Sequence, residues 1–215
     1  MLDNVEPRLK EAYFLQDGQG LIDINKSQYT SFLKVRGKVV AFNEPTGIDI
    51  VQKLTRISFS DFEGITEKQE YVREVVQGYF YAHCSIQSQI FHFLKLFVNG
   101  LYELSYFQDF NMEHIALDYE TQYTSVSQSF EYYPYPFNFV FTQPSEMLDP
   151  KVVDHYVKSI KKGLLPIIFA ANVKSGDTYG HCDYIIDGHS KLVAYETCDR
   201  TPPAFIRISR ILPSK

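Results

Sequence analysis

The chain has 215 residues, of which 45% are hydrophobic and 22% charged, a composition that is ordinary for a soluble globular protein. No apolar run is long enough to cross a bilayer, and the polar first ten residues do not resemble a signal peptide. We therefore expect a cytoplasmic protein with no membrane partner. Three cysteines without metal-ligand spacing favour reduced thiols over a metal site.

The charge is unevenly distributed along the chain. Residues 1–150 carry 11 Lys and Arg against 20 Asp and Glu, a net charge of −9, whereas residues 151–215 carry 10 against 6, a net charge of +4. The acidic excess repels DNA, so no DNA partner is expected. Because the charge changes sign near Pro150, we expect two domains, at 1–140 and 141–215.

Turn signals between apolar segments predict antiparallel hairpins in the first part of the chain. The flanking strands are expected at 12–16 and 21–24, at 32–35 and 39–42, and at 90–98 and 101–107. The third pair surrounds Asn99-Gly100, although Phe93, Leu94 and Phe97 also fit a helical stripe. We further expect a helix at 66–77, a strand at 119–130 and a proline-rich edge or linker at 131–137.

The last part of the chain changes character. Asp149 before Pro150 is typical of a helix start, and Gly163 marks its end. Strands are then expected at 166–170, 182–186 and 205–208, with a helix at 189–198 between the last two. The fold class expected is α+β, in which a largely antiparallel β domain of unknown role precedes a small α/β domain.

Two segments of this last part, from Tyr156 to Ile167 and from Tyr184 to Ala194, together resemble the ParB/sulfiredoxin-like superfamily. The run from Tyr156 to Ile167, which contains Ser159-Ile160 and Gly163-Leu164, is similar to the opening segment of ParB-type domains. The run from Tyr184 to Ala194 is similar to the second family motif, a strand, a glycine turn and a helix. The resemblance covers about 65 residues and implies the superfamily's nucleotide-binding fold.

The turn Asp187-Gly188-His189-Ser190-Lys191 distinguishes among members of that superfamily. Sulfiredoxins have a nucleophilic cysteine where this chain has His189, so the reduction of sulfinic acids is not expected. Partition proteins have arginines where this chain has Ser190 and Lys191. The ADP-dependent free serine kinases, with Asp-Gly-His-His-Arg, match best, because their first three residues are present here.

A glycine turn that opens a helix is a plausible phosphate site, since backbone N–H groups and the helix dipole both favour anions there. We expect Gly188, Ser190 and an exposed Lys191 to hold phosphate, and Asp187 and His189 to act as acid/base groups or to orient Mg²⁺. The implied function is nucleotide or phosphate-ester binding, with ADP or ATP and Mg²⁺ as cofactors and phosphoryl transfer left open. The alternative is a non-catalytic or immunity-type protein that retains the fold and binds a protein partner through its aromatic-rich first domain.

Overall fold

The computed structural model describes residues 6–27, 30–46, 49–54, 83–108, 139–142, 148–174, 183–200 and 204–213. The elements expected at 66–77, 119–130 and 131–137 lie outside these residues. The described strands are β1 (Leu9–Leu15), β2 (Ile22–Ser27), β3 (Thr30–Val35), β4 (Lys38–Thr46), β5 (Asp49–Leu54), β6 (Gly100–Gln108), β7 (Phe139–Phe141), β8 (Ile168–Lys174), β9 (Asp183–Asp187) and β10 (Ala204–Ile211). The described helices are α2 (Ile86–Gln89), α3 (Phe91–Leu94), α4 (Pro150–Lys161) and α5 (His189–Thr197).

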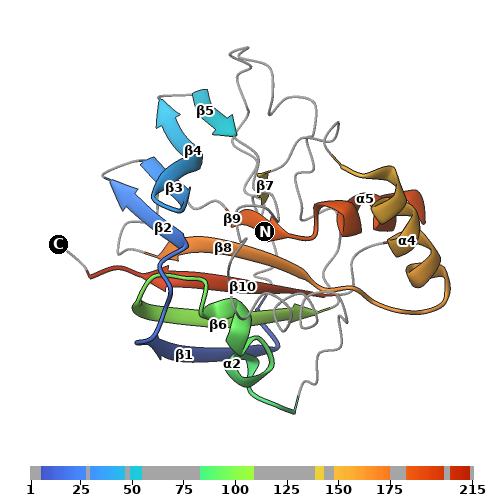
Figure 1. The fold of residues 1–215 in the computed structure, drawn as a ribbon, viewed down its shortest axis with the longest axis horizontal. Helices are drawn as coiled ribbons and strands as arrows, with labels where there is room; N and C mark the ends of the chain where they lie inside the picture. Colours follow the sequence, from blue (N-terminus) through green and yellow to red (C-terminus); the bar gives the residue numbers. More distant parts are fainter. Residues whose placement is uncertain are drawn as a thin grey trace.

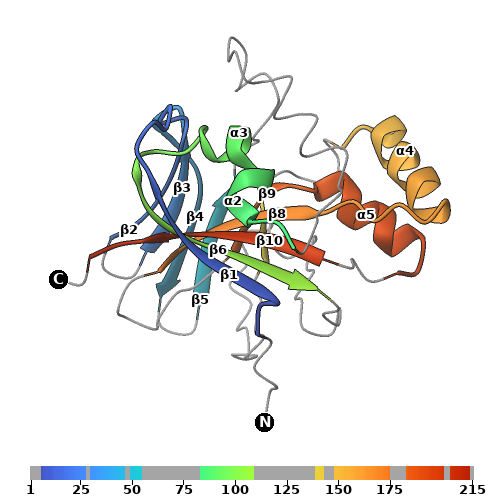
Figure 2. The same ribbon diagram turned by 90° about the horizontal axis from the view of Figure 1, so that it is seen from below.

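The strands form two sheets. One has the order β1-β6-β10-β8-β9-β7, and the other is the antiparallel meander β2-β3-β4-β5. In the larger sheet only the pairs β10–β8 and β9–β7 are parallel. Figures 1 and 2 show the smaller sheet at one end of the molecule and the α4–α5 pair at the other. These observations confirm the expected α+β class.

The larger sheet takes strands from both sides of the expected domain boundary. β1 and β6 precede residue 140, β8 to β10 follow it, and β7 spans it. The antiparallel pairing of β6 with β10 joins residues about a hundred positions apart in the sequence. The change of charge near Pro150 therefore does not coincide with a break in the sheet.

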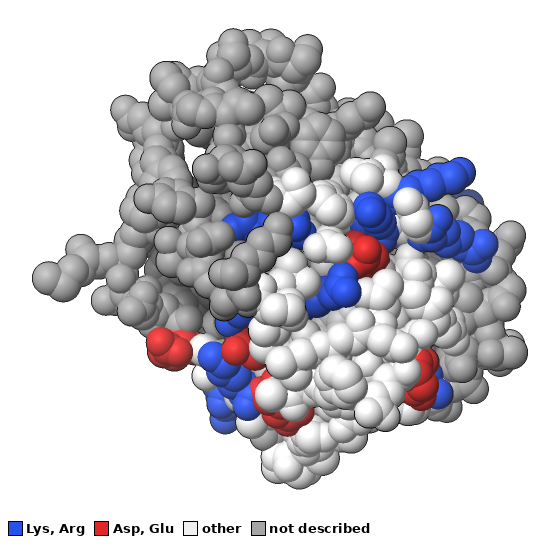
Figure 3. Space-filling view, turned by 90° about the vertical axis from the view of Figure 1, so that its left-hand side faces the viewer, with Lys and Arg blue, Asp and Glu red and all other residues white. Residues whose placement is uncertain are grey.

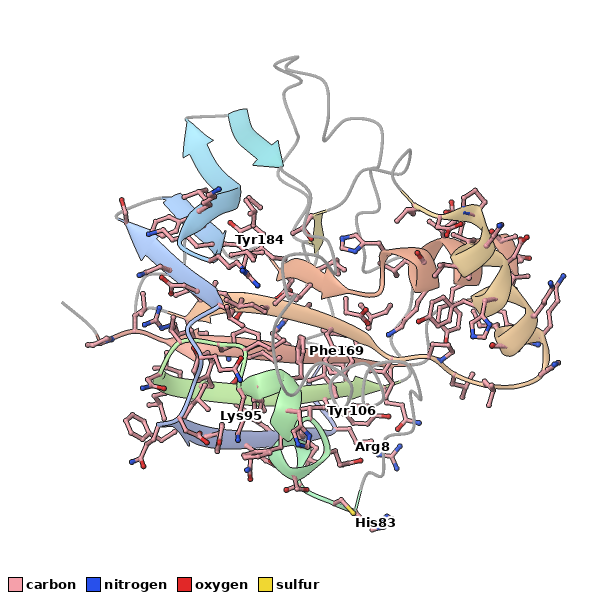
Figure 4. All side chains as sticks on the ribbon, viewed as in Figure 1. Arg8, His83, Lys95, Tyr106, Phe169 and Tyr184 are labelled. Carbon is pink, nitrogen blue, oxygen red and sulfur yellow. The ribbon has the colours of Figure 1, made fainter. Side chains whose placement is uncertain are left out.

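The larger apolar cluster among the described residues joins side chains of the two sheets and of helices α2 and α3. It includes Ile22 and Leu33 from the smaller sheet, Phe93 from α3, and Leu104 and Ile206 from the larger sheet, all fully buried. In Figure 4 the labelled Tyr106, Phe169 and Tyr184, which belong to the same cluster, lie over the middle of the molecule, whereas His83 lies at its lower edge. Burial of these apolar side chains is the main favourable contribution to folding.

Two polar contacts also connect the sheets. The Tyr184 hydroxyl on β9 donates to the backbone carbonyl of Ser31 on β3 over 2.7 Å. Arg210 on β10 forms an ion pair with Asp23 on β2 and donates to the carbonyl of Ile24 over 3.2 Å. Figure 3 views the molecule from the side of the smaller sheet, where acidic and basic side chains lie close to each other around a larger uncharged area.

One of the three expected hairpins is confirmed. β3 and β4 pair antiparallel with Val35 opposite Lys38, and the two intervening residues, Arg36 and Gly37, have φ values of 49° and 74°. Positive φ at both central positions is what a two-residue hairpin with a type I′ turn requires. The strands β1 and β2 form as expected, but they do not pair with each other, since β1 pairs with β6 and β2 with β3.

The expected hairpin around Asn99-Gly100 is wrong. β6 follows the turn, but the segment before it contains the short helices α2 and α3 in place of a strand. Phe93 and Leu94, whose helical spacing was the competing signal, are buried against the core. Glu11 on β1 also accepts the N–H groups of Ile86 and Gln87 at the start of α2, over 2.8 and 3.2 Å. Packing against the core and this cap therefore stabilise helices, and not a strand, in this segment.

Candidate functional site

Gly188 lies between β9 and α5, as the sequence predicts. Its φ of 122° falls in a region that residues with a side chain rarely adopt. A Cβ atom at this position would lie 3.1 Å from side-chain atoms of Ile168 on β8, closer than ordinary van der Waals contact. A glycine is therefore required both by the backbone conformation and by the close approach of β8. The elements around it follow the expected order of helix, strand, strand, glycine turn, helix and strand.

Lys191 is buried, which corrects the expectation that its side chain is exposed. Its side chain is 1% exposed, and its ammonium group forms an ion pair with Asp187 one helical turn earlier. The same Nζ donates to the backbone carbonyl of Ile167 over 2.8 Å. It also lies 5.8 Å from the centre of the Tyr156 ring and 5.7 Å from that of Phe169. Because a buried ammonium needs such partners, these contacts explain why a lysine is tolerated here.

Asp187 is the acidic partner of this ion pair and has a side-chain exposure of 15%. Burial raises the pKa of its carboxyl group, while the charge of Lys191 and the hydrogen bond from it act in the opposite direction. Burial has the larger effect, so the pKa is raised overall, and Lys191 is the charged partner of Asp187 within the fold. In this arrangement Asp187 holds the first turn of α5 against the end of β9.

His189 is also buried, with 6% of its surface exposed. Its Nε2 accepts the backbone N–H of Thr142, which follows β7, over 3.1 Å, and the Thr142 hydroxyl lies 3.2 Å from the same nitrogen. Because Nε2 accepts from a backbone amide, the neutral ring carries its proton on Nδ1. Burial lowers the pKa of His189 to about 3. A neutral imidazole bonded to backbone suits a structural link between α5 and β7 better than acid/base catalysis near neutral pH.

We expect the His189 ring to remain neutral throughout the physiological pH range. Because its folded pKa of about 3 lies below the unfolded value of about 6.5, the unfolded chain alone takes up this proton as the pH falls. The contribution to folding stability is therefore complete above about pH 6.5 and declines by up to about 1.4 kcal/mol per pH unit towards pH 3. Ring resonances followed by NMR from pH 8 to pH 5, and assigned with a His189→Gln variant, should show no midpoint for this residue. A midpoint near 6.5 would contradict the buried, neutral state.

The five predicted site residues thus lie together in the chain but differ in their surroundings. Asp187, His189 and Lys191 face internal partners, Gly188 contacts β8, and the half-buried Ser190 lies in the first turn of α5. Among the described residues, no group of three or more His, Cys, Asp or Glu side chains is placed to hold a metal ion. None of the described helices is long and apolar enough to span a membrane.

Sequence reasoning missed a second group of polar residues on the larger sheet. Arg207 on β10 donates to Asp183 on β9 over 2.6 Å, and the Asn172 amide on β8 donates to the other oxygen of the same carboxylate over 2.9 Å. Asp183 and Asn172 are 4% and 5% exposed. The sequence did contain a signal for this group. In β10 the polar residues Arg207 and Ser209 alternate with the apolar Ile206 and Ile208, and alternate residues of a strand share one face.

No protein-family model and no curated protein matches this chain.

Proposed function

We propose that this chain is a non-catalytic binding protein, in which the strand–glycine–helix turn that resembles the ParB/sulfiredoxin-like superfamily serves as structure. One observation carries the proposal. Lys191 is the cation that would bind a phosphate, and its side chain is 1% exposed and already paired with Asp187. A phosphate would have to displace that carboxylate and also the carbonyl of Ile167. His189, the expected acid/base group, is held neutral by its burial.

A panel of nucleotides tests this proposal on the wild-type protein. ADP, ATP and CTP, each with and without Mg²⁺ at millimolar concentration, should leave the thermal unfolding midpoint unchanged, because a ligand raises it only by binding the folded state. Inorganic phosphate should behave in the same way. A rise of several degrees that saturates with one nucleotide would instead restore the nucleotide-binding interpretation.

An exposed apolar pair supports a protein as the binding partner. Phe14 on β1 is 60% exposed, and Leu101, its register partner on β6, is 40% exposed. Both lie at the β1 edge of the larger sheet, where an aromatic next to a leucine provides the kind of apolar anchor that protein interfaces use.

The variant Phe14→Ser/Leu101→Ser should recover at least about tenfold less of the principal co-purifying protein from a lysate of the source cells, the loss expected when an anchor worth more than about 1.4 kcal/mol is removed. Val39→Ser is the matched control, because Val39 is 49% exposed on the smaller sheet. It should recover the wild-type amount, and quantitative mass spectrometry compares the three. Equal recovery by all three proteins would exclude this edge as the partner site.

A further inference from the structure

One face of the larger sheet carries a strip of polar residues, whereas the opposite face belongs to the apolar core. Across three adjacent strands, Glu103 on β6, Ser209 on β10 and Asn172 on β8 are register partners and form one row. Ser209 is 0% exposed and Asn172 is 5% exposed. A row of buried polar side chains requires hydrogen-bonding partners, because desolvation without compensation is unfavourable.

The charged members of this face are paired. Glu103 forms ion pairs with Lys10 and with Lys174. Burial raises the pKa of the Glu103 carboxyl group, but the two lysines lower it by more. The pKa is therefore lowered overall. Asp183 at the other end of the row accepts from Arg207 and Asn172. The middle of the row therefore lies between two compensated charges and suits a neutral group.

Two atoms in the middle of the row have no hydrogen-bonding partner in the part of the chain that the structure describes, namely Asn172 Oδ1 and Ser209 Oγ. The orientation of the Asn172 amide is fixed, since an ionised carboxylate can only accept and Asp183 must therefore face Nδ2. Oδ1, the other arm of the amide, then points away from Asp183. It needs a donor, whereas the Ser209 hydroxyl can donate or accept.

From this arrangement we propose that a hydroxyl-type guest binds between Asn172 and Ser209, donating to Oδ1 and bonding to Oγ. Neighbouring strands lie about 4.8 Å apart, so one oxygen atom at about 2.8 Å from each side chain bridges the two positions. A neutral guest matches the compensated charges on both sides. Solvent water and the hydroxyl of a small organic ligand share this chemistry.

The sign of a stability change tests the proposal. Ser209→Ala should lower the denaturant midpoint, by a shift similar to that of Ser105→Ala, because each removes a hydroxyl with a partner. Ser105 is the matched control: it is 2% exposed on the same face and donates to Glu103 over 3.3 Å. A hydroxyl without any partner would behave in the opposite way, since its removal relieves a desolvation cost. A Ser209→Ala midpoint equal to or above that of the wild type overturns the proposal.

A second measurement identifies the source of the hydroxyl. A high-resolution crystal structure of the wild type should show density between Asn172 Oδ1 and Ser209 Oγ, and its absence also overturns the proposal. If the guest is an organic molecule, native mass spectrometry of the purified protein should show added mass, and refolding in ligand-free buffer should lower the thermal midpoint. If it is water, the mass and the midpoint should both be unchanged.

Discussion

Replacing Lys191 with alanine should lower the free energy of unfolding by about 3–5 kcal/mol, the cost of breaking a buried ion pair by removing one partner. The variant leaves Asp187 in an environment that raises the pKa of its carboxyl group, now without the cation that opposed this effect. It also leaves the carbonyl of Ile167 without the donor that contacts it over 2.8 Å. Urea denaturation at pH 7 measures the change.

The matched control is Lys161→Ala, since Lys161 is an exposed lysine in the last turn of α4. It should change the stability by no more than about 0.5 kcal/mol, as is usual for surface substitutions. A double variant, Asp187→Asn/Lys191→Met, should be less destabilised than Lys191→Ala, because it removes the unpaired charge as well as the pair. A Lys191→Ala protein as stable as the control would mean that the ammonium is available for other roles.

Replacing Gly188 with alanine should lower the free energy of unfolding by about 2–5 kcal/mol, the combined cost of a strained φ and of overpacking against a neighbour. The φ of 122° disfavours a side chain, and the new Cβ would lie 3.1 Å from Ile168 on the adjacent strand and 3.3 Å from its Cα. Relief of this contact would move α5 away from β8. Thermal and chemical denaturation of the purified variant provide the measurement.

The variant Gly163→Ala separates the cost of the strained φ from the cost of overpacking. Gly163 follows α4 with a φ of 87°, and beyond its chain neighbours a Cβ there would meet no atom of the described residues within 4 Å. It should therefore show only the backbone strain, about 1–3 kcal/mol, and the Gly188 variant should be destabilised more. Equal losses for the two variants would show that β8 yields to the added methyl group.

Local signals in the sequence predicted the elements that depend on local contacts. Asp149 accepts the N–H of Lys151 over 2.9 Å at the start of α4, and Pro150 occupies the first turn, as their order in the sequence indicates. The Arg36-Gly37 turn likewise needs only its own residues and two short strands. The position of Gly188 was predicted correctly, because a glycine between an apolar strand and a helix usually forms the turn that joins them.

Contacts between distant residues explain what the sequence did not predict. The partner of β1 is β6, about ninety positions later, and no turn signal encodes that pairing. Lys191 was expected to be exposed because it was assigned to hold phosphate, yet it is one of the rare buried lysines. The carboxylate of Asp187, four residues earlier, was visible in the sequence, but the carbonyl of Ile167 and the rings of Tyr156 and Phe169 come together only in the folded chain.

The side chains of Asp187, His189 and Lys191 are engaged by partners within the fold. The most direct test of this arrangement against phosphate binding is an NMR titration of the ¹⁵N-labelled wild-type protein with Mg²⁺-ADP, Mg²⁺-ATP and inorganic phosphate, which follows the backbone amides of Gly188, Ser190 and Lys191. We predict that these resonances stay unchanged up to millimolar ligand, because Lys191 remains paired with Asp187. Saturable shifts of these three amides with one nucleotide would contradict the account and identify the turn as a phosphate site.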